Sequence, residues 1–212
     1  AAVLPRVVWS GEDRQLAAQL REVYGLGVRQ LLVGNLGQLK IAKAAGFAVR
    51  GDFGLNIYNS RSMQYLRGQG VDSQLLSFEL TLPQIRDISK AVPSEVLVYG
   101  RLPLMLMENC VIKNRTGTCA CDAGVTKLVD RMGEEFPIVK DGGSCRNVLL
   151  NGKKLYLLDK LAAFRGMGLW ALRLSFTTEN AGEVDKVLAD WVRGGTFEPG
   201  SYTRGLYQRG VE

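Results

Sequence analysis

The chain has 212 residues, of which 46% are hydrophobic and 23% charged, and a net charge of +6 that favours polyanionic partners only mildly. It contains no histidine, which excludes Ser-His-Asp and Cys-His catalysis and imidazole-dependent zinc sites for the side chains of this chain. No apolar run approaches the roughly 20 residues that span a bilayer and no secretory signal opens the chain, so we expect a cytoplasmic protein without a membrane partner.

Strand-like and helix-like segments alternate through the first half of the chain. The apolar runs predict strands, and the segments between them carry helix-like spacing and start or stop residues. Strands are expected at residues 5–9, 28–35, 47–56, 73–80 and 94–107, and helices at 11–27, 36–46, 59–70 and 81–92. One strand–helix pair every ~20–25 residues is typical of βα units and a parallel sheet.

The alternation breaks after residue 108 and resumes near residue 160. Residues 109–124 read as a loop, and two hairpins should follow, one turning near Met132 and one at the Asn151-Gly152 pair. A short helix is expected at 161–168, a sixth βα-type strand at 169–177 and a last helix at 181–194.

These elements predict an α/β fold. Eight βα units close a barrel, and this chain has six. We therefore expect an incomplete (β/α) barrel of the TIM type with a β-hairpin insertion that carries the cysteines, and an open doubly wound sheet is the alternative. Residues 1–212 would form one domain with the insertion at 108–160. Because the chain begins with Ala, we expect it to be part of a longer protein.

All four cysteines lie in the predicted insertion: Cys110, Cys119, Cys121 and Cys145. Two disulfides would suit a small secreted domain, which this chain does not resemble. Buried unrelated thiols would need apolar neighbours, whereas Asn, Arg, Thr, Gly and Asp surround these. Structural zinc sites usually show paired Cys-x2–4-Cys knuckles, which are missing here, and iron–sulfur clusters accept irregular spacing. The spacing favours a metal centre, with iron–sulfur ahead of zinc.

Segments on both sides of the cysteines carry a family resemblance. Around them stand "VYGRLPLMLMENCVI", the Cys-x-Cys, "LVDRMGEEFPI", Cys145 followed by Arg146 and Asn147, and "LRLSFTTE", and upstream of them "VGNLG", "VRGDFGLNIYNS" and "LLSFEL". In this order they resemble the peptidase U32 family, most closely the later part of the long U32 proteins that carry an additional domain.

The resemblance implies a barrel-like core and four cysteines that hold a [4Fe–4S] cluster. The family was named for collagenase-like proteolysis, and several members support oxygen-independent hydroxylation of RNA bases or of the ubiquinone ring. Prephenate is implicated as a hydroxyl source in the RNA-acting members. Many members have a histidine in a His-Gly-Ala-containing motif shortly before the first cysteine. This chain has "LMLMENC" there, so no histidine role is carried over.

Charged residues near the predicted strand ends are the other candidates for a site. We expect Asp52 and Glu79 to handle protons, and Arg50, Arg101 and Arg146 to bind an anionic group of the substrate. The structural alternative for each is a salt bridge that braces the barrel mouth.

Three functions are carried forward. The first is an iron–sulfur enzyme that supports oxygen-independent hydroxylation of RNA or a similar substrate. The second is a U32 collagenase-like peptidase, and the third is a non-catalytic domain, stabilised by zinc or a cluster, that docks onto the rest of its own longer chain. The tail alternates Tyr202, Arg204, Tyr207 and Arg209. These residues could stack on RNA, although packing against the barrel base is the preferred interpretation.

Overall fold

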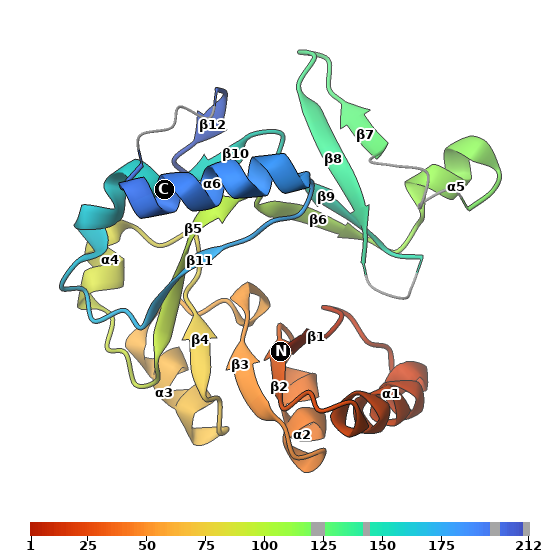
Figure 1. Cartoon of the computed structure of the whole chain (residues 1–212). Helices are drawn as coiled ribbons and strands as arrows, with labels where there is room; N and C mark the ends of the chain where they lie inside the picture. The colour runs from red at the N-terminus through yellow and green to blue at the C-terminus, as the bar shows by residue number, and fades with distance from the viewer. Residues whose placement is uncertain (120–125, 142–144, 196–199, 210–212) are drawn as a thin grey trace. The chain divides into compact units, whose positions relative to one another are not determined.

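The computed structural model describes residues 1–119, 126–141, 145–195 and 200–209. Its chain forms two compact units, coloured along the sequence in Figure 1. The first comprises Ala1–Leu97, Ala163–Arg173 and Gly205–Glu212, and the second comprises Val98–Ala162 and Leu174–Arg204. The fold is mixed α/β with a parallel central sheet, as the alternating pattern predicted.

The first unit consists of strand–helix repeats. Its elements are β1 (Ala2–Val3), α1 (Asp13–Gly25), β2 (Gln30–Val33), α2 (Leu36–Ala44), β3 (Ala48–Gly51), α3 (Ser60–Gly68), β4 (Ser73–Leu75), α4 (Leu82–Asp87) and the start of β5 (Ser94–Gly100). Strands β1 to β5 pair in parallel in chain order. Three helices begin at side-chain caps, because Asn35, Asn59 and Thr81 accept backbone N–H groups of the first turn.

The core of the first unit is apolar and includes a residue of the tail. Leu31, Val33 and Val49 are fully buried in the central strands. Tyr207 is 1% exposed, its hydroxyl donates to the carbonyl of Leu97 at 2.8 Å, and its ring meets the edge of Phe164. This favours packing over RNA stacking for that tyrosine.

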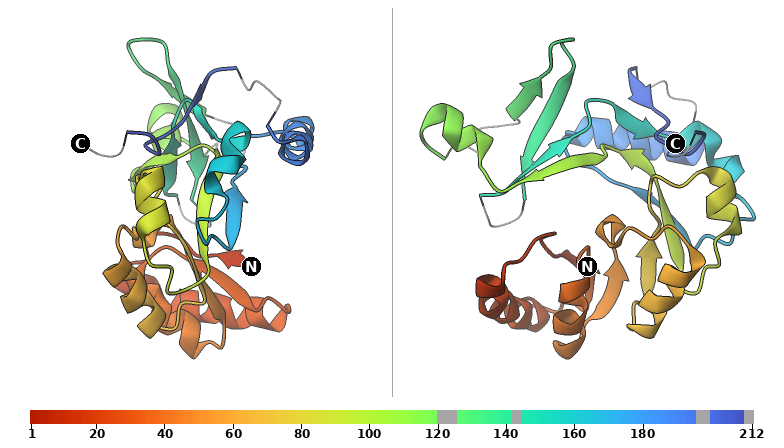
Figure 2. Two further views of the ribbon diagram at one scale, coloured as in Figure 1. Left: turned by 90° about the vertical axis from the view of Figure 1, so that its left-hand side faces the viewer. Right: turned by 180° about the vertical axis from the view of Figure 1, so that it is seen from behind.

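The second unit contains two strand groups. In the first, β10 (Lys154–Tyr156) pairs antiparallel with the end of β5 and parallel with β12 (Tyr202–Thr203). The second is an antiparallel sheet in the order β6 (Pro103–Met107), β9 (Asn147–Leu150), β8 (Glu135–Lys140) and β7 (Thr126–Val129). Figure 2 shows the β7–β8 hairpin from two further sides. The unit also holds α5 (Val111–Thr116) and α6 (Ala181–Arg193), while the 3-10 helix at Leu158–Phe164 and β11 (Ala171–Leu174) run across the boundary of the units.

Several predicted elements need correction. The first strand is Ala2–Val3 and not residues 5–9. The long strand predicted at 94–107 is two strands, β5, which ends at Gly100, and β6, and Arg101 and Leu102 separate them. Gly100 has φ +129°, and a Cβ there would lie 2.2 Å from the carbonyl oxygen of Ser175. Only glycine fits this backbone without strain.

The insertion also differs from its prediction. The 109–124 segment contains the helix α5. The hairpin at 146–159 is wrong, because β9 pairs with β6 and β8 whereas β10 pairs with β5 and β12. The hairpin around Met132 is confirmed as β7–β8. The described cysteines lie in the segments beside this hairpin and not in its strands.

A closed barrel is not seen among the described strands, whose pairings do not return to β1. Within the same residues, no helix combines the length and the apolar character needed to cross a bilayer.

Candidate functional site

One end of the sheet β6-β9-β8-β7 is built from four strand ends. Met107, the last residue of β6, is paired with Asn147, the first residue of β9, and Lys140, the last residue of β8, is paired with the same Asn147. Thr126, the first residue of β7, is paired with Ile138 near the end of β8. Because the strands are antiparallel, these ends lie together. We call this the cysteine end of the sheet.

Every cysteine-bearing segment enters or leaves the sheet at the cysteine end. Cys110 follows β6, Cys119 lies between α5 and β7, and Cys145 lies two residues before the start of β9. Cys121 lies outside the described residues, between Cys119 and the start of β7 in the sequence. Strand register therefore brings to one place segments whose cysteines are up to 35 positions apart in the chain.

Two contacts tie the Cys110 segment to the Cys145 segment. The Arg146 guanidinium Nε lies 2.6 Å from the Glu108 carboxylate, and the Arg146 side chain is only 5% exposed. The backbone N–H of Val111 donates to the Asn147 side-chain oxygen at 3.1 Å. Each contact joins a residue beside Cys110 to a residue beside Cys145.

The three described cysteines have different surroundings. Cys110 is 7% exposed and caps α5, where its sulfur accepts the backbone N–H of Lys113 at 3.4 Å. Cys119 and Cys145 are exposed. The thiolate is the form of cysteine that binds metals.

The donor type fits a thiolate-bound centre, because the sequence places four cysteines in segments that connect strands of this sheet. Among the described residues, a backbone N–H already donates to the sulfur of Cys110. Residues 120–125 and 142–144 of the connecting segments lie outside the described part. Within the described part, no three Cys, Asp or Glu side chains are close enough together to hold a metal ion. The candidate metal ligands are thus identified by the strands that their segments connect, and not by a set of side chains already arranged around a metal position.

In the first unit, a network of charges joins two of the predicted site residues. Glu95, in β5, is 2% exposed and lies between two arginines. It accepts from Arg50 Nη2 at 2.5 Å and from Arg173 Nη2 at 2.8 Å. Arg173 Nη1 also contacts Asp52 at 2.7 Å, directly after β3. We call these four residues the Glu95 network. Glu95 and Arg173 were not predicted.

Glu79 is not part of the Glu95 network among the described residues. It lies in a turn after β4 and not in the strand that the sequence predicted. Its backbone carbonyl accepts the Tyr58 hydroxyl at 3.1 Å. Burial and, second, the charge of Glu79 raise the pKa of Tyr58. The two carboxylates predicted to act together therefore belong to different local groups.

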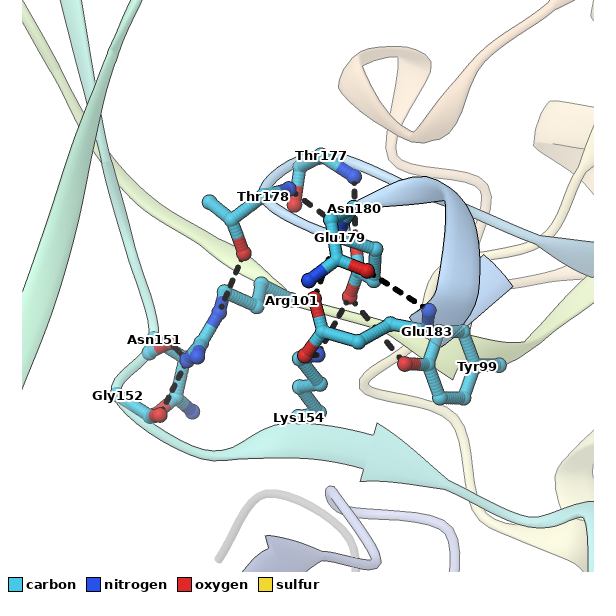
Figure 3. Close-up of polar contacts among 10 residues, drawn as sticks. All are labelled: Tyr99, Arg101, Asn151, Gly152, Lys154, Thr177, Thr178, Glu179, Asn180 and Glu183. Carbon is cyan, nitrogen blue, oxygen red and sulfur yellow. Dashed lines mark hydrogen bonds and ion pairs between the residues drawn. The ribbon is translucent and has the colours of Figure 1, made fainter. Parts of the chain in front are cut away.

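Arg101 holds the turn between β9 and β10 (Figure 3). Its guanidinium donates to the carbonyl of Asn151 at 2.8 Å and to that of Gly152, and its Nε donates to the Thr178 hydroxyl at 3.2 Å. These bonds fix the end of the β6–β9 pair that lies opposite the cysteine end. These contacts fit the alternative considered for Arg101, that it braces the structure and does not bind substrate.

Glu179 is the centre of the same polar cluster (Figure 3). Its side chain is fully buried and accepts the N–H groups of Thr177 and Thr178 at 2.7 and 3.1 Å, the Tyr99 hydroxyl at 3.2 Å and the Lys154 ammonium at 3.0 Å. Burial opposes the charge of Glu179, but the Thr177 N–H and Lys154 outweigh it, so the pKa of Glu179 lies below its ordinary value. Burial, followed by the charge of Glu179, raises the pKa of Tyr99.

Replacing Glu179 with Gln should lower the free energy of unfolding at neutral pH by about 1.5–3 kcal/mol, because hydrogen bonds to a charged acceptor are lost. The folded-state pKa of this carboxyl is depressed, so its stabilisation is complete above the ordinary value of 4.5 and is lost as the pH falls through the folded-state pKa. Urea denaturation of both proteins from neutral to acidic pH should show the difference shrinking. A difference that is independent of pH would contradict this account.

Comparison with known proteins identifies one family. The model described as Peptidase family U32 matches residues 6–191, a range that includes the Glu95 network and all four cysteines. The resemblance noted from the sequence is thereby confirmed. No curated protein and no solved structure matches the chain.

Proposed function

Because this chain belongs to peptidase family U32, we propose that it is an iron–sulfur protein that supports oxygen-independent hydroxylation of RNA or a similar substrate. The observation that carries the proposal is the arrival of every cysteine-bearing segment at one end of a four-stranded sheet. Scattered packing thiols would have no reason to share a sheet end.

Cys110, Cys119, Cys121 and Cys145 would hold a [4Fe–4S] cluster, and zinc is the alternative occupant. When bound, the cluster would supply electron-transfer chemistry. The chain contributes the four thiols and the Lys113 N–H that donates to the Cys110 sulfur. Such hydrogen bonds tune the potential of a cluster. A reducing compartment suits the free thiols that such a site requires, so we propose a cytoplasmic location.

The substrate side of the proposal rests mainly on the first unit. Arg50 is 28% exposed and lies 5.1 Å from the ring centre of Trp170, which is itself 57% exposed. An exposed aromatic face beside a cation suits a base and its phosphate. Asp52 remains the preferred proton-handling group, with its charge held by Arg173, and Glu79 is the second candidate.

The roles proposed for the other two arginines are less direct. Arg101 donates to carbonyl groups of a turn and Arg146 is paired with Glu108, so an anion would have to compete with these partners. We also propose that the parallel sheet is part of a (β/α) barrel, completed by a further part of a longer chain.

A collagenase-like peptidase is the alternative within the family. It would need an activated nucleophile or a metal-bound water. The sequence has no histidine, and the carboxylate pair that could replace one, Asp52 and Glu79, does not share a network. A non-catalytic docking domain stabilised by zinc or a cluster is the other alternative. The exposed Trp170 ring beside Arg50 favours the hydroxylating function over it.

Anaerobic purification followed by counting of iron, sulfide and zinc tests the proposal. We expect about four irons and four sulfides per chain with the broad visible absorption of an iron–sulfur cluster. One zinc and no iron would overturn it. Mass spectrometry of RNA from a strain that lacks the gene should then show the loss of a hydroxylated base, whereas unchanged RNA would remove RNA as the substrate.

A further inference from the structure

The ion pair between Arg146 and Glu108 is unequal. The Arg146 side chain is 5% exposed and the Glu108 side chain 53% exposed. The buried member of the pair lies directly after Cys145, and the exposed member lies two residues before Cys110. The pair therefore joins the two cysteine-bearing segments at the cysteine end of the sheet.

The second contact at this end, the Val111–Asn147 hydrogen bond, joins the same two segments as the ion pair. Glu108 lies two residues before Cys110, and Val111 lies directly after it. On the other segment, Arg146 and Asn147 are the two residues after Cys145. On one segment, the two contacting residues, Glu108 and Val111, lie on either side of Cys110. On the other segment, both contacting residues come directly after Cys145. We call Glu108, Arg146 and Asn147 the cysteine bracket.

We infer that the cysteine bracket is a positioning device for the metal ligands, an inference that rests on the proposed function. Its two contacts hold the Cys110 and Cys145 segments side by side before a metal binds, which lowers the ordering cost of binding. The buried Arg146 guanidinium also offsets the negative charge that converging thiolates bring to this end. Arg146 thereby acquires a role different from the substrate contact that the sequence suggested.

Titration of the full chain with Co²⁺ under anaerobic, reducing conditions tests the bracket. Cobalt is the probe because its bonds to thiolates give a charge-transfer absorption that reports on sulfur ligation. Replacing Glu108 with Gln, or Arg146 with Lys, should weaken Co²⁺ binding about 10–100-fold, the usual cost of losing a group that orients metal ligands. Lysine keeps the charge but not the planar donor geometry.

The matched control is Glu135→Gln. It breaks the exposed Lys127–Glu135 pair of the same sheet, and Glu135 is the first residue of β8, at the end opposite the cysteines. This variant should bind Co²⁺ like the wild type. Thermal unfolding of each metal-free protein separates positioning from stability, because a purely structural role would lower the melting temperature and leave Co²⁺ affinity unchanged.

The results separate the two proposals. Wild-type Co²⁺ affinity in Glu108→Gln would overturn the bracket and leave the proposed function intact. A wild-type chain that takes up neither Co²⁺ nor iron would overturn the proposed function itself. If Arg146→Lys does not fold, Glu108→Gln alone decides, since its side chain is half-exposed and keeps its size. In a double variant, the losses should be less than additive, because both residues belong to one contact.

Discussion

Replacing any one of the four cysteines with serine should remove most of the bound iron and sulfide, and the loss should be similar at all four positions. Iron–sulfur clusters of this type take one thiolate at each ligand position, and a serine hydroxyl is a far poorer ligand than a thiolate at neutral pH. The measurement is iron and sulfide per chain after anaerobic purification of each variant, with the visible spectrum as a second readout.

Because the cysteines differ in burial, this prediction distinguishes metal ligands from thiols that serve only for packing. Cys110 is buried, whereas Cys119 and Cys145 are exposed. If the thiols served only for packing, Cys110→Ser would destabilise the chain and the two exposed positions would be silent. If they are ligands, the exposed positions matter as much as the buried one. Cys121, which lies outside the described residues, belongs to the same set by sequence.

Circular dichroism of each serine variant provides the control, since loss of iron must not follow from loss of fold. Full iron content in Cys119→Ser or Cys145→Ser would remove that residue from the ligand set. Two such results would leave too few thiolates for a four-iron cluster, and zinc or unrelated thiols would then be the better explanation of the cysteine spacing.

The sequence predicted local structure well where a helix start is encoded by its own first turn. Asn59 and Thr81 stand where they accept backbone N–H groups, and α3 and α4 begin directly after them. Both capping residues act within four positions of the chain, so no knowledge of the tertiary structure was needed.

Prediction failed where a distant segment decides the outcome. Residues 94–107 are mostly apolar and were predicted as one strand, whereas β5 ends at Gly100, which lies close to the backbone of Ser175. The Asn151-Gly152 pair does form a turn, but Arg101 holds its carbonyl groups and the following strand pairs with β5. Strand partners depend on non-local packing, which a turn signal does not encode.

The candidate site residues divide in the same way, into those that the local sequence indicated and those that depend on distant segments. The four cysteines were proposed as ligands from their spacing, and Asp52 and Arg50 were proposed as site residues from their place near a strand end. Glu95 was missed, although a carboxylate inside the apolar run "SEVLVYG" must find a cation when buried. That rule would have flagged Glu95, but it could not have named Arg173, which lies 78 residues away in the sequence.

Replacing Glu95 with Gln should lower the free energy of unfolding by about 3–5 kcal/mol, the cost of breaking a buried ion pair from one side. The carboxylate is 2% exposed and neutralises both Arg50 and Arg173. Glutamine keeps the shape and removes the charge, so Arg50 would lose the carboxylate of Glu95 and Arg173 would keep its contact with Asp52. Urea denaturation at neutral pH measures the effect.

Glu135→Gln is again the matched control, since its partner Lys127 is 48% exposed and such a pair contributes at most about 1 kcal/mol. If Glu95→Gln costs no more than this control, the arginines are solvated in the folded protein and the Glu95 network is not a buried charge cluster. A large loss would mean that Asp52 keeps its place through Arg173, whose position depends on Glu95. The Glu95 network would then hold Asp52 in a fixed position, which a side chain that transfers protons to or from a substrate requires.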